Sequence, residues 1–240
     1  MSKIDLQHGD CLELMKKIPD NSIDMILCDL PYGTSANKWD IIIPFNKLWE
    51  QYNRIIKRGG AIVLFASMPF TASLVSSNTK GFKYSWVWNK HAFANQMQAH
   101  YAPLKITEDI LVFTKDGKKA NYNPQNLIRI NQLTRQGEKV TENIGGGTRN
   151  KIYKQKYTNY PRNILSFKRD NSRLHPTQKP VPLLEYLIKT YTNKKETVLD
   201  NCMGSGSTGV AAKKLNRNFI GMELDDKYFN IAKERINKEV

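Results

Sequence analysis

Asp29-Leu30-Pro31-Tyr32 is the segment of the sequence with the most specific chemistry. It follows an apolar run, residues 23–28, whose length and composition are typical of a buried strand. The Asp29 carboxylate accepts hydrogen bonds, and Pro31 holds the preceding backbone extended, so the Leu30 carbonyl has a fixed direction. The ring of Tyr32 adds a flat stacking surface. Two acceptors beside such a surface suit a planar ring with an exocyclic amino group, and a nucleobase is the obvious candidate.

A glycine-rich turn forms a second candidate site. Gly204-x-Gly206-x-x-Gly209 stands between an expected strand and an expected helix, and Glu223 ends the next strand about 20 positions further on. This arrangement lets a nucleotide ligand approach the backbone while the carboxylate binds ribose hydroxyls. NAD, FAD and S-adenosyl-L-methionine (SAM) all use this geometry. The alternative is a tight turn that needs glycine for backbone reasons only.

The elements that must position these groups alternate along the chain. Apolar runs and alternating patterns predict strands, and capped amphipathic patterns predict helices, with Gly59-Gly60 ending one of them. Such alternation indicates a doubly wound, mostly parallel α/β sheet. The expected strands are 4–10, 23–29, 61–65, 84–88, 110–113, 196–200 and 218–223, and the expected helices are 11–18, 44–57, 69–77, 182–191, 207–215 and 225–238.

The charge of the chain points to a polyanionic partner. The 240 residues carry a formal net charge of +15, and residues 115–173 contribute 14 Lys and Arg against 4 Asp and Glu. Regular patterns are absent from this basic block. Charge concentrated in one block is typical of a nucleic-acid-binding surface. The alternative is a basic loop without a reading role.

The cysteines and the N-terminal residues bear on the compartment. Cys11, Cys28 and Cys202 are odd in number and lack disulfide or metal-ligand spacing, which favours a reducing compartment and no metal site. The N-terminal residues lack an apolar signal segment, and no apolar run reaches membrane-spanning length. We therefore expect a cytoplasmic protein without a membrane partner.

Three segments resemble the motifs of one enzyme family. His175-Pro176-Thr177-Gln178-Lys179-Pro180 matches in full the H-P-T-Q-K-P motif of the amino-group DNA methyltransferases of the β group, which includes many adenine-N6 enzymes. Asp29 to Tyr32 resembles their (D/N/S)-P-P-(Y/F) motif, with leucine for the first proline. Residues 200–208 are similar to their D-P-F-x-G-S-G-T-T segment, with Asn-Cys for Pro-Phe. The likeness covers roughly 1–114 and 174–240.

The resemblance implies a fold and a division into domains. The fold would be α/β, a doubly wound, mostly parallel, seven-stranded SAM-dependent methyltransferase sheet with one antiparallel strand near an edge. It would be circularly permuted, because the catalytic half precedes the cofactor half. The implied parts are a catalytic half (1–114), a basic target-recognition insertion (115–173) and a SAM-binding half (174–240).

The resemblance also assigns roles to residues. Asp29 and the Leu30 carbonyl would accept from the amino group of a flipped base, Tyr32 would stack on it, and Lys179 would pair with the carboxylate of SAM. Trp39-Asp40 either shapes the base pocket or anchors its loop. The catalytic residues are Asp29, Leu30, Pro31 and Tyr32; those that bind the cofactor are Asp10, Cys11, Asp29, Thr177, Gln178, Lys179, Asp200, Cys202, Gly204, Ser205, Gly206, Ser207 and Glu223. The expected DNA contacts are Trp39, Arg149, Lys151, Lys154, Lys156, Arg162, Arg169 and Arg173.

The implied function is site-specific methylation of adenine N6 in double-stranded DNA, with SAM as methyl donor and after base flipping. A cytosine-N4 methyltransferase shares the fold and the chemistry, although aspartate at the first motif position favours adenine. The basic block argues against an enzyme that acts on a protein amide, whereas RNA stays open as a substrate. The intact motif residues argue against an inactive nucleic-acid-binding module. A homodimer, common among β-group relatives, and a cognate restriction enzyme stay open as partners.

Overall fold

The computed structural model describes residues 2–34, 40–135, 152–170 and 178–239. The chain forms two compact units: Met1–Asn123 together with Asn163–Val240, and Pro124–Arg162. Residues 115–123 and 163–170 of the basic block thus belong to the larger unit.

The larger unit is built on an eight-stranded sheet of order β1-β10-β9-β2-β3-β5-β4-β8. β5 is antiparallel to both of its neighbours, and every other neighbouring pair in this sheet is parallel. The expected number of seven strands is wrong because a short strand, β8, pairs with Val87, Trp88 and Asn89 of β4 and extends the edge. The strands are β1 (Ile4–His8), β2 (Ile23–Asp29), β3 (Ile56–Ala66), β4 (Phe82–Ala94), β5 (Lys105–Thr114), β8 (Ile164–Ser166), β9 (Thr197–Asp200) and β10 (Asn218–Glu223).

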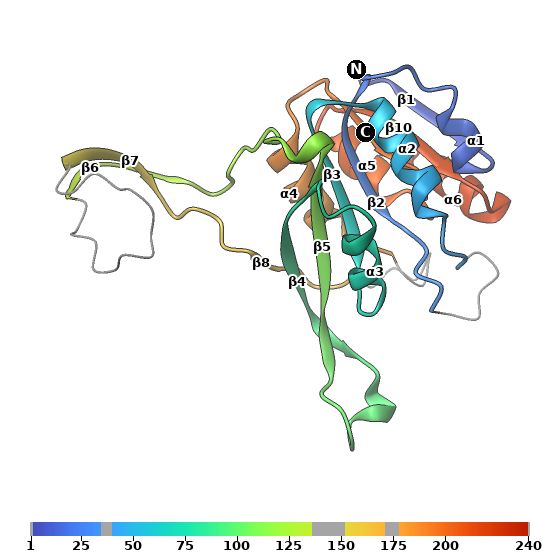
Figure 1. Ribbon diagram of the computed structural model, residues 1–240, viewed down its shortest axis with the longest axis horizontal. Coiled ribbons are helices and arrows are strands. Elements are labelled where there is room, and N and C mark those ends of the chain that lie inside the picture. Colours follow the sequence, from blue (N-terminus) through green and yellow to red (C-terminus); the bar gives the residue numbers. More distant parts are fainter. Residues whose placement is uncertain (1, 35–39, 136–151, 171–177, 240) are drawn as a thin grey trace. The chain divides into compact units, whose positions relative to one another are not determined.

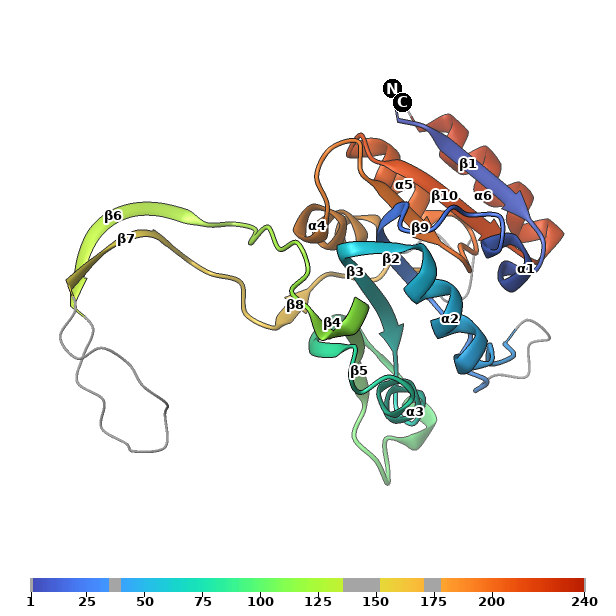
Figure 2. The ribbon, with the colours of Figure 1, turned by 45° about the horizontal axis from the view of Figure 1, so that its top comes forward.

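Helices cover both faces of this sheet (Figures 1 and 2). In β3, Val63 and Phe65 belong to one hydrophobic cluster, whereas Ile62 and Leu64 belong to the other, because successive side chains of a strand point to opposite faces. The first cluster contains residues of α4, α5 and α6, and the second contains residues of α1, α2 and α3. The expected mostly parallel α/β architecture is confirmed. The helices are α1 (Cys11–Met15), α2 (Phe45–Ile55), α3 (Phe70–Ser77), α4 (Val181–Tyr191), α5 (Ser207–Lys214) and α6 (Asp226–Lys238), with 3-10 turns η1 (Gln96–Gln98) and η2 (Lys115–Gly117).

The junction between α2 and β3 differs from expectation. The helix ends at Ile55, and Ile56 is already the first residue of β3. Gly59 and Gly60, expected to end the helix, lie inside the strand. Gly59 has a φ of +89°, and a Cβ on Gly60 would lie 2.8 Å from the carbonyl oxygen of Asp24. The two glycines therefore let β3 bend and pass close to β2.

The smaller unit contains an antiparallel pair of strands, β6 (Ile128–Arg135) and β7 (Ile152–Thr158). The expectation that residues 115–173 lack regular structure is therefore wrong for these two segments. The side chains of β7 are exposed or half-buried along its whole length. A ribbon without a buried face carries no clear apolar alternation, so the pattern that identifies the strands of the larger sheet is absent here.

Among the helices described, none is long and apolar enough to span a membrane.

Candidate active site

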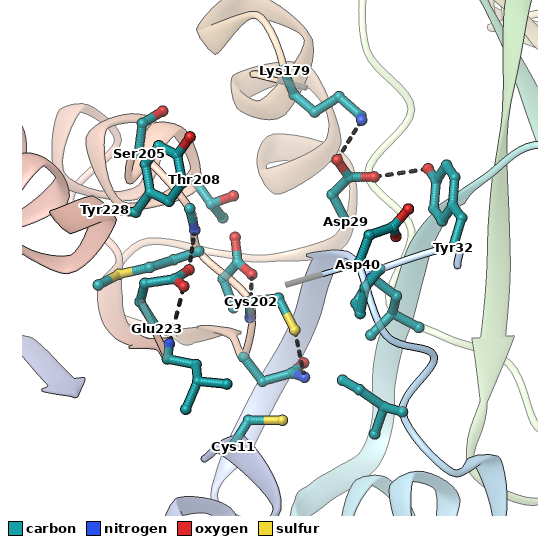
Figure 3. Close-up of a pocket in the computed structure, with 18 of the residues that line it drawn as sticks. Cys11, Asp29, Tyr32, Asp40, Lys179, Cys202, Ser205, Thr208, Glu223 and Tyr228 are labelled. Carbon is teal, nitrogen blue, oxygen red and sulfur yellow. Dashed lines mark hydrogen bonds and ion pairs between the residues drawn. The ribbon is translucent and has the colours of Figure 1, made fainter. Parts of the chain in front are cut away.

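A cavity of about 640 Å³ lies at the carboxyl ends of three parallel strands (Figure 3). Asp29, Asp200 and Glu223 are the last residues of β2, β9 and β10, and all three line it. Its volume is in the range of ligand pockets, and this edge is where open α/β sheets bind ligands. The structure thus brings the two candidate segments found in the sequence into one cavity.

Asp29 lies between two hydrogen-bond donors in this cavity (Figure 3). Tyr32 Oη donates to Asp29 Oδ1 over 2.7 Å, and Lys179 Nζ donates to Oδ2 over 2.5 Å. The Tyr32 ring stacks on Phe70, with 4.9 Å between the ring centroids. Packing on Phe70 thus fixes the tyrosine that orients the carboxylate.

Lys179 is one of four linked charges. Only 8% of its side chain is exposed, which excludes a solvated surface lysine. Its ammonium lies 3.4 Å from Glu108 Oε2 and 5.0 Å from the centre of the Phe65 ring. Glu108 Oε1 pairs with Lys90 Nζ at 3.0 Å. Neither Glu108 on β5 nor Lys90 on β4 is predicted from the sequence. The available signal for Glu108 is the acidic pair directly before the apolar run 110–113.

These contacts set the protonation of the cluster. Burial raises the pKa of Asp29 above its ordinary value, although Lys179 opposes the shift. Burial alone would also raise the pKa of Glu108, but the ammonium groups of Lys179 and Lys90 outweigh it and leave that pKa low. Burial would lower the pKa of Lys179, but Asp29 and Glu108 raise it, so Lys179 is charged. Lys179 was expected to pair with the carboxylate of SAM; its partners here are Asp29 and Glu108, and pairing with SAM stays a prediction.

The glycine turn is tied to the end of β10. The Gly204 N–H donates to Glu223 Oε2 over 2.8 Å, and Glu223 Oε1 accepts from the N–H groups of Leu224 and Asp225. Gly204 has a φ of +52°, in the left-handed region that favours glycine. Gly204, Ser205 and Ser207 line the cavity together with Glu223. Ser205 and Glu223 are labelled in Figure 3.

The other two glycines of the turn serve packing. Gly206 has a φ of +78°, and its Cβ would lie 2.9 Å from the Ala232 Cβ; it is not among the residues that line the cavity. A Cβ on Gly209 would lie 2.3 Å from Ile236 Cδ1 and 2.7 Å from Phe219 Cε1. The turn therefore combines a backbone requirement with the close packing of α5 against α6 and β10.

Asp200 ends β9 inside the cavity. Its Oδ1 accepts from the Cys202 N–H over 3.1 Å. Burial raises the pKa of Asp200 to about 7, although a hydrogen bond with Thr208 opposes the shift. This carboxyl therefore changes charge near neutral pH.

Arg235 of α6, a residue not predicted from the sequence, joins the turn to the segment before α4. Its Nη1 donates to Ser205 O over 3.0 Å, to Ser207 Oγ over 3.0 Å and to Gln178 Oε1 over 3.3 Å. Ser205 Oγ also donates to Gln178 Oε1 over 2.9 Å, and Gln178 Nε2 donates to Asp170 Oδ2 over 2.6 Å. The arginine thereby holds three residues expected to bind the cofactor.

Asp10 and two of the three cysteines also belong to the lining of the cavity. Asp10 lines the cavity and caps α1, because its Oδ1 accepts from the N–H groups of Leu12 and Glu13. Cys11 and Cys202 also line the cavity, and Cys28 is buried behind it. A hydrogen bond with Cys202 and burial raise the pKa of Cys11, and burial raises that of Cys28 to about 12, so both are neutral thiols. Within the described residues no group of three or more His, Cys, Asp or Glu could hold a metal ion.

Asp40 anchors the loop that follows residues 29–32. Its Oδ1 accepts from the Gly33 N–H over 2.8 Å and its Oδ2 from the Thr34 N–H over 2.9 Å. Asp40 also lines the cavity, so it both anchors the loop and contributes to the wall.

The expected DNA contacts are only partly described. Lys154 and Lys156 are exposed on β7, and Arg162 is the last residue of the smaller unit. Arg169 belongs to the larger unit and lines the cavity. The expected site residues that lie outside the described ranges are Trp39, Arg149, Lys151, Arg173 and, for the cofactor, Thr177.

The fold and the cavity define an α/β protein that binds a ligand of nucleotide type at the carboxyl edge of its sheet. The sequence model of the DNA methylase family, N6/N4 type, matches residues 23–234. The type II methyltransferase M.HpaI of Haemophilus parainfluenzae is 29% identical over 243 residues, 96% of this chain and 73% of the relative. The DNA adenine methyltransferase YhdJ of Escherichia coli (strain K12) is 29% identical over 249 residues, 96% of this chain and 81% of the relative.

Solved structures share the same fold. A complex of M1.HpyAVI with SAM has a TM-score of 0.67 at 25% identity and covers 98% of this chain and 99% of that one. The cytosine-N4-specific PvuII DNA methyltransferase has a TM-score of 0.72 at 16% identity, over 98% of this chain and 86% of that one. The chain belongs to the N6/N4 family of SAM-dependent DNA methyltransferases.

The residues of the cavity fit SAM. SAM carries a sulfonium cation, ribose hydroxyls and an amino group, all of which favour carboxylates as neighbours. Acidic side chains outnumber basic ones in the wall: Asp10, Asp29, Asp40, Glu108, Asp200 and Glu223 against Arg169 and Lys179.

Proposed function

We propose that the chain is a site-specific DNA methyltransferase that transfers a methyl group from SAM to N6 of adenine in double-stranded DNA. The observation that carries the proposal is that Asp29 and the turn at 204–207 share one cavity. A base held at Asp29 and a methyl donor held at the turn would then occupy the same cavity.

Binding of SAM is assigned to groups at the ends of the strands. The Glu223 carboxylate, fixed by the Gly204 N–H, would accept from ribose hydroxyls. Asp10 would accept from the adenine amino group of SAM through its Oδ2, because only Oδ1 takes part in the cap of α1. Arg235 keeps Ser205 and Gln178 in place around the rest of the ligand.

The target base must leave the DNA stack, because the duplex hides its amino group. Tyr32 lies next to Asp29 and lines the cavity, so its ring can contact a flipped base. The basic residues of the smaller unit, such as Lys154 and Lys156, would contact phosphates, which give affinity without sequence information. Base reading is assigned to the same basic block.

The chemical step uses acceptors for the substrate amino group. SAM supplies an electrophilic methyl carbon when it is bound. The adenine amino group is a weak nucleophile because its lone pair is delocalised into the ring. Asp29 and the Leu30 carbonyl each accept one N–H, which favours a tetrahedral nitrogen whose lone pair faces the methyl carbon. With SAM bound, its methyl group would pass to this nitrogen, the electron pair of the broken S–C bond would stay on sulfur, and Asp29 would accept the proton that the nitrogen loses. Positioning and electrostatics supply the rate.

Methyl transfer to defined duplexes tests the proposal. We expect labelled SAM to yield labelled N6-methyladenine in digested DNA. Label in N4-methylcytosine instead would show that the target base is cytosine and not adenine. Asp29→Ala should reduce transfer by about a thousandfold or more, while SAM still raises its Tm. The matched control is Asp24→Asn, which alters a buried carboxylate of the same strand that does not line the cavity. Near-normal turnover of Asp29→Ala would refute the assignment.

The order of the segments supports the remaining expectations. The catalytic strand β2 precedes the cofactor strands β9 and β10 in the chain, as a circularly permuted fold requires. M.HpaI is described as a type II methyltransferase, which supports a restriction enzyme as partner of this chain. The homodimer stays an expectation from the family.

A further inference from the structure

Four side chains form an alternating row of charges that leads from the cavity into the sheet. Asp29 pairs with Lys179 at 2.5 Å, Lys179 lies 3.4 Å from Glu108, and Glu108 pairs with Lys90 at 3.0 Å. Their exposed side-chain fractions are 21%, 8%, 17% and 4%, in the order Asp29, Lys179, Glu108 and Lys90. The formal charges of the row cancel. A buried charge is costly without a partner, so each member constrains the position of the next.

The Asp29 carboxylate has both oxygens engaged, by Tyr32 and by Lys179. A substrate amino group that donates to Asp29 must therefore share or replace one of these donors. Tyr32 is held by its packing on Phe70. Lys179 has a second anion within reach, because Glu108 Oε2 is buried, faces the ammonium at 3.4 Å and forms no hydrogen bond with the described residues.

We propose that Glu108 is a positioning residue that controls access to Asp29, because its Oε2 provides a second ion-pair partner for the Lys179 ammonium. The inference rests on the proposed methyl transfer but holds for either target base. While Asp29 is unused, Lys179 bridges the two carboxylates. When a substrate amino group donates to Asp29, the ammonium moves onto Glu108 and remains paired. Lys90 holds Glu108 from the other side and keeps the row neutral.

The groups that face Asp29 set the direction of the pH effect. The negative charge of Glu108 raises the pKa of Asp29, so its removal should lower that pKa. Transfer needs an ionised Asp29, and its rate falls as the pH drops through this pKa. The acid limb of the rate profile should then move to lower pH. The titratable groups facing Asp29 are Cys28 of β2, Tyr32 after β2, Glu108 of β5, Lys179 before α4 and Asp200 of β9.

The test is Glu108→Gln, which keeps the shape of the side chain and removes its charge. Lys179 then loses the second carboxylate, stays paired with Asp29 and blocks it. We expect kcat to fall by about tenfold or more, with KM for SAM and for DNA changed by less than about threefold. The acid limb of the kcat profile should shift measurably to lower pH.

Two further variants separate positioning from a general effect of a lost ion pair. Asp24→Asn removes the partner of Lys57 from a 2.7 Å pair away from the cavity and should leave kcat and the acid limb unchanged. Glu108→Asp keeps the charge, so the acid limb should stay in place with a kcat between those of wild type and Glu108→Gln. If Glu108→Gln does not fold, Glu108→Asp alone decides. A reduced kcat of Glu108→Asp with an unchanged acid limb of the kcat profile supports the proposal, and a kcat equal to that of wild type overturns it.

Failure of the inference is distinct from failure of the proposed function. A wild-type protein that methylates no DNA base refutes the function before any variant is compared. An active wild type with an unchanged Glu108→Gln variant, or with an equal shift in Asp24→Asn, refutes the role of Glu108 alone.

Discussion

The Lys179 ammonium should stabilise the fold far more than a lysine on the surface. Lys179→Met keeps the apolar stem but removes the counter-ion of Asp29, whereas Glu108 keeps Lys90 as its partner. Loss of one partner of a buried pair costs about 3–5 kcal/mol. The side chains of Asp29 and Glu108 are 21% and 17% exposed, so solvent screens part of the orphaned charge. We therefore expect a loss in the free energy of unfolding near the lower end, about 3 kcal/mol.

Thermal unfolding measures this loss. For a chain of this length 1 kcal/mol corresponds to about 2–4 °C, so the Tm of Lys179→Met should fall by about 6–12 °C at pH 8. Burial already raises the pKa of Asp29, and removal of Lys179 raises it further. As the pH falls through that raised pKa, the carboxyl gains a proton and no longer needs a counter-ion. The difference in Tm between wild type and variant should therefore narrow from pH 8 to pH 5.

A matched variant is Lys189→Met on α4. Lys189 is 44% exposed and pairs with Glu185 at 3.8 Å, so its loss should cost less than about 1 kcal/mol. If Lys179→Met loses no more stability than Lys189→Met, or if its loss does not depend on pH, the ammonium does not hold the two carboxylates as the structure indicates.

Two further variants probe other parts of the site. Burial raises the pKa of Asp200 from 3.8 to about 7, so the stability linked to its proton is present below pH 3.8 and is lost as the pH rises toward 7. Asp200→Asn should therefore raise the Tm of the protein without SAM more at pH 8 than at pH 5. An equal change in Tm at both pH values would contradict this reasoning. Gly209→Ala places a methyl group 2.3 Å from Ile236 Cδ1 and should cost about 1–3 kcal/mol of stability, while calorimetry finds the Kd for SAM unchanged; weaker SAM binding at an unchanged Tm would instead make Gly209 a ligand contact.

The sequence identifies the buried part of the fold well. Strands buried on both faces need apolar residues at every position, which is why the runs at 23–28, 61–65 and 110–113 are visible. β6 and β7 have no buried face to impose a pattern, and β8 is only 3 residues long. The early end of α2 has another cause, since the chain enters β3 without a connecting loop.

The site is predictable where it follows the ends of strands. Asp29 and Glu223 meet because parallel strands bring their carboxyl ends to one edge. Glu108 and Lys90 acquire their place from the strand order β3-β5-β4, in which an antiparallel strand reaches the same edge by its first half. Arg235 acts through the packing of α6 against the turn. These relations depend on the fold and not on local spacing, so apart from the acidic pair at 108–109 the sequence carries no signal for these residues.

The contact between Asp29 and Lys179 joins positions 150 residues apart, and Arg235 supports the site from still later in the chain. A ribosome adds about 5–20 residues per second, so roughly 10–40 s separate the synthesis of Asp29 from that of Arg235. During that interval the nascent polypeptide contains Asp29 but lacks β9, β10 and α6, which complete the cavity. The cavity can therefore form only late in synthesis, because a chain that ends before β9 lacks the lining residues between Asp200 and Tyr228.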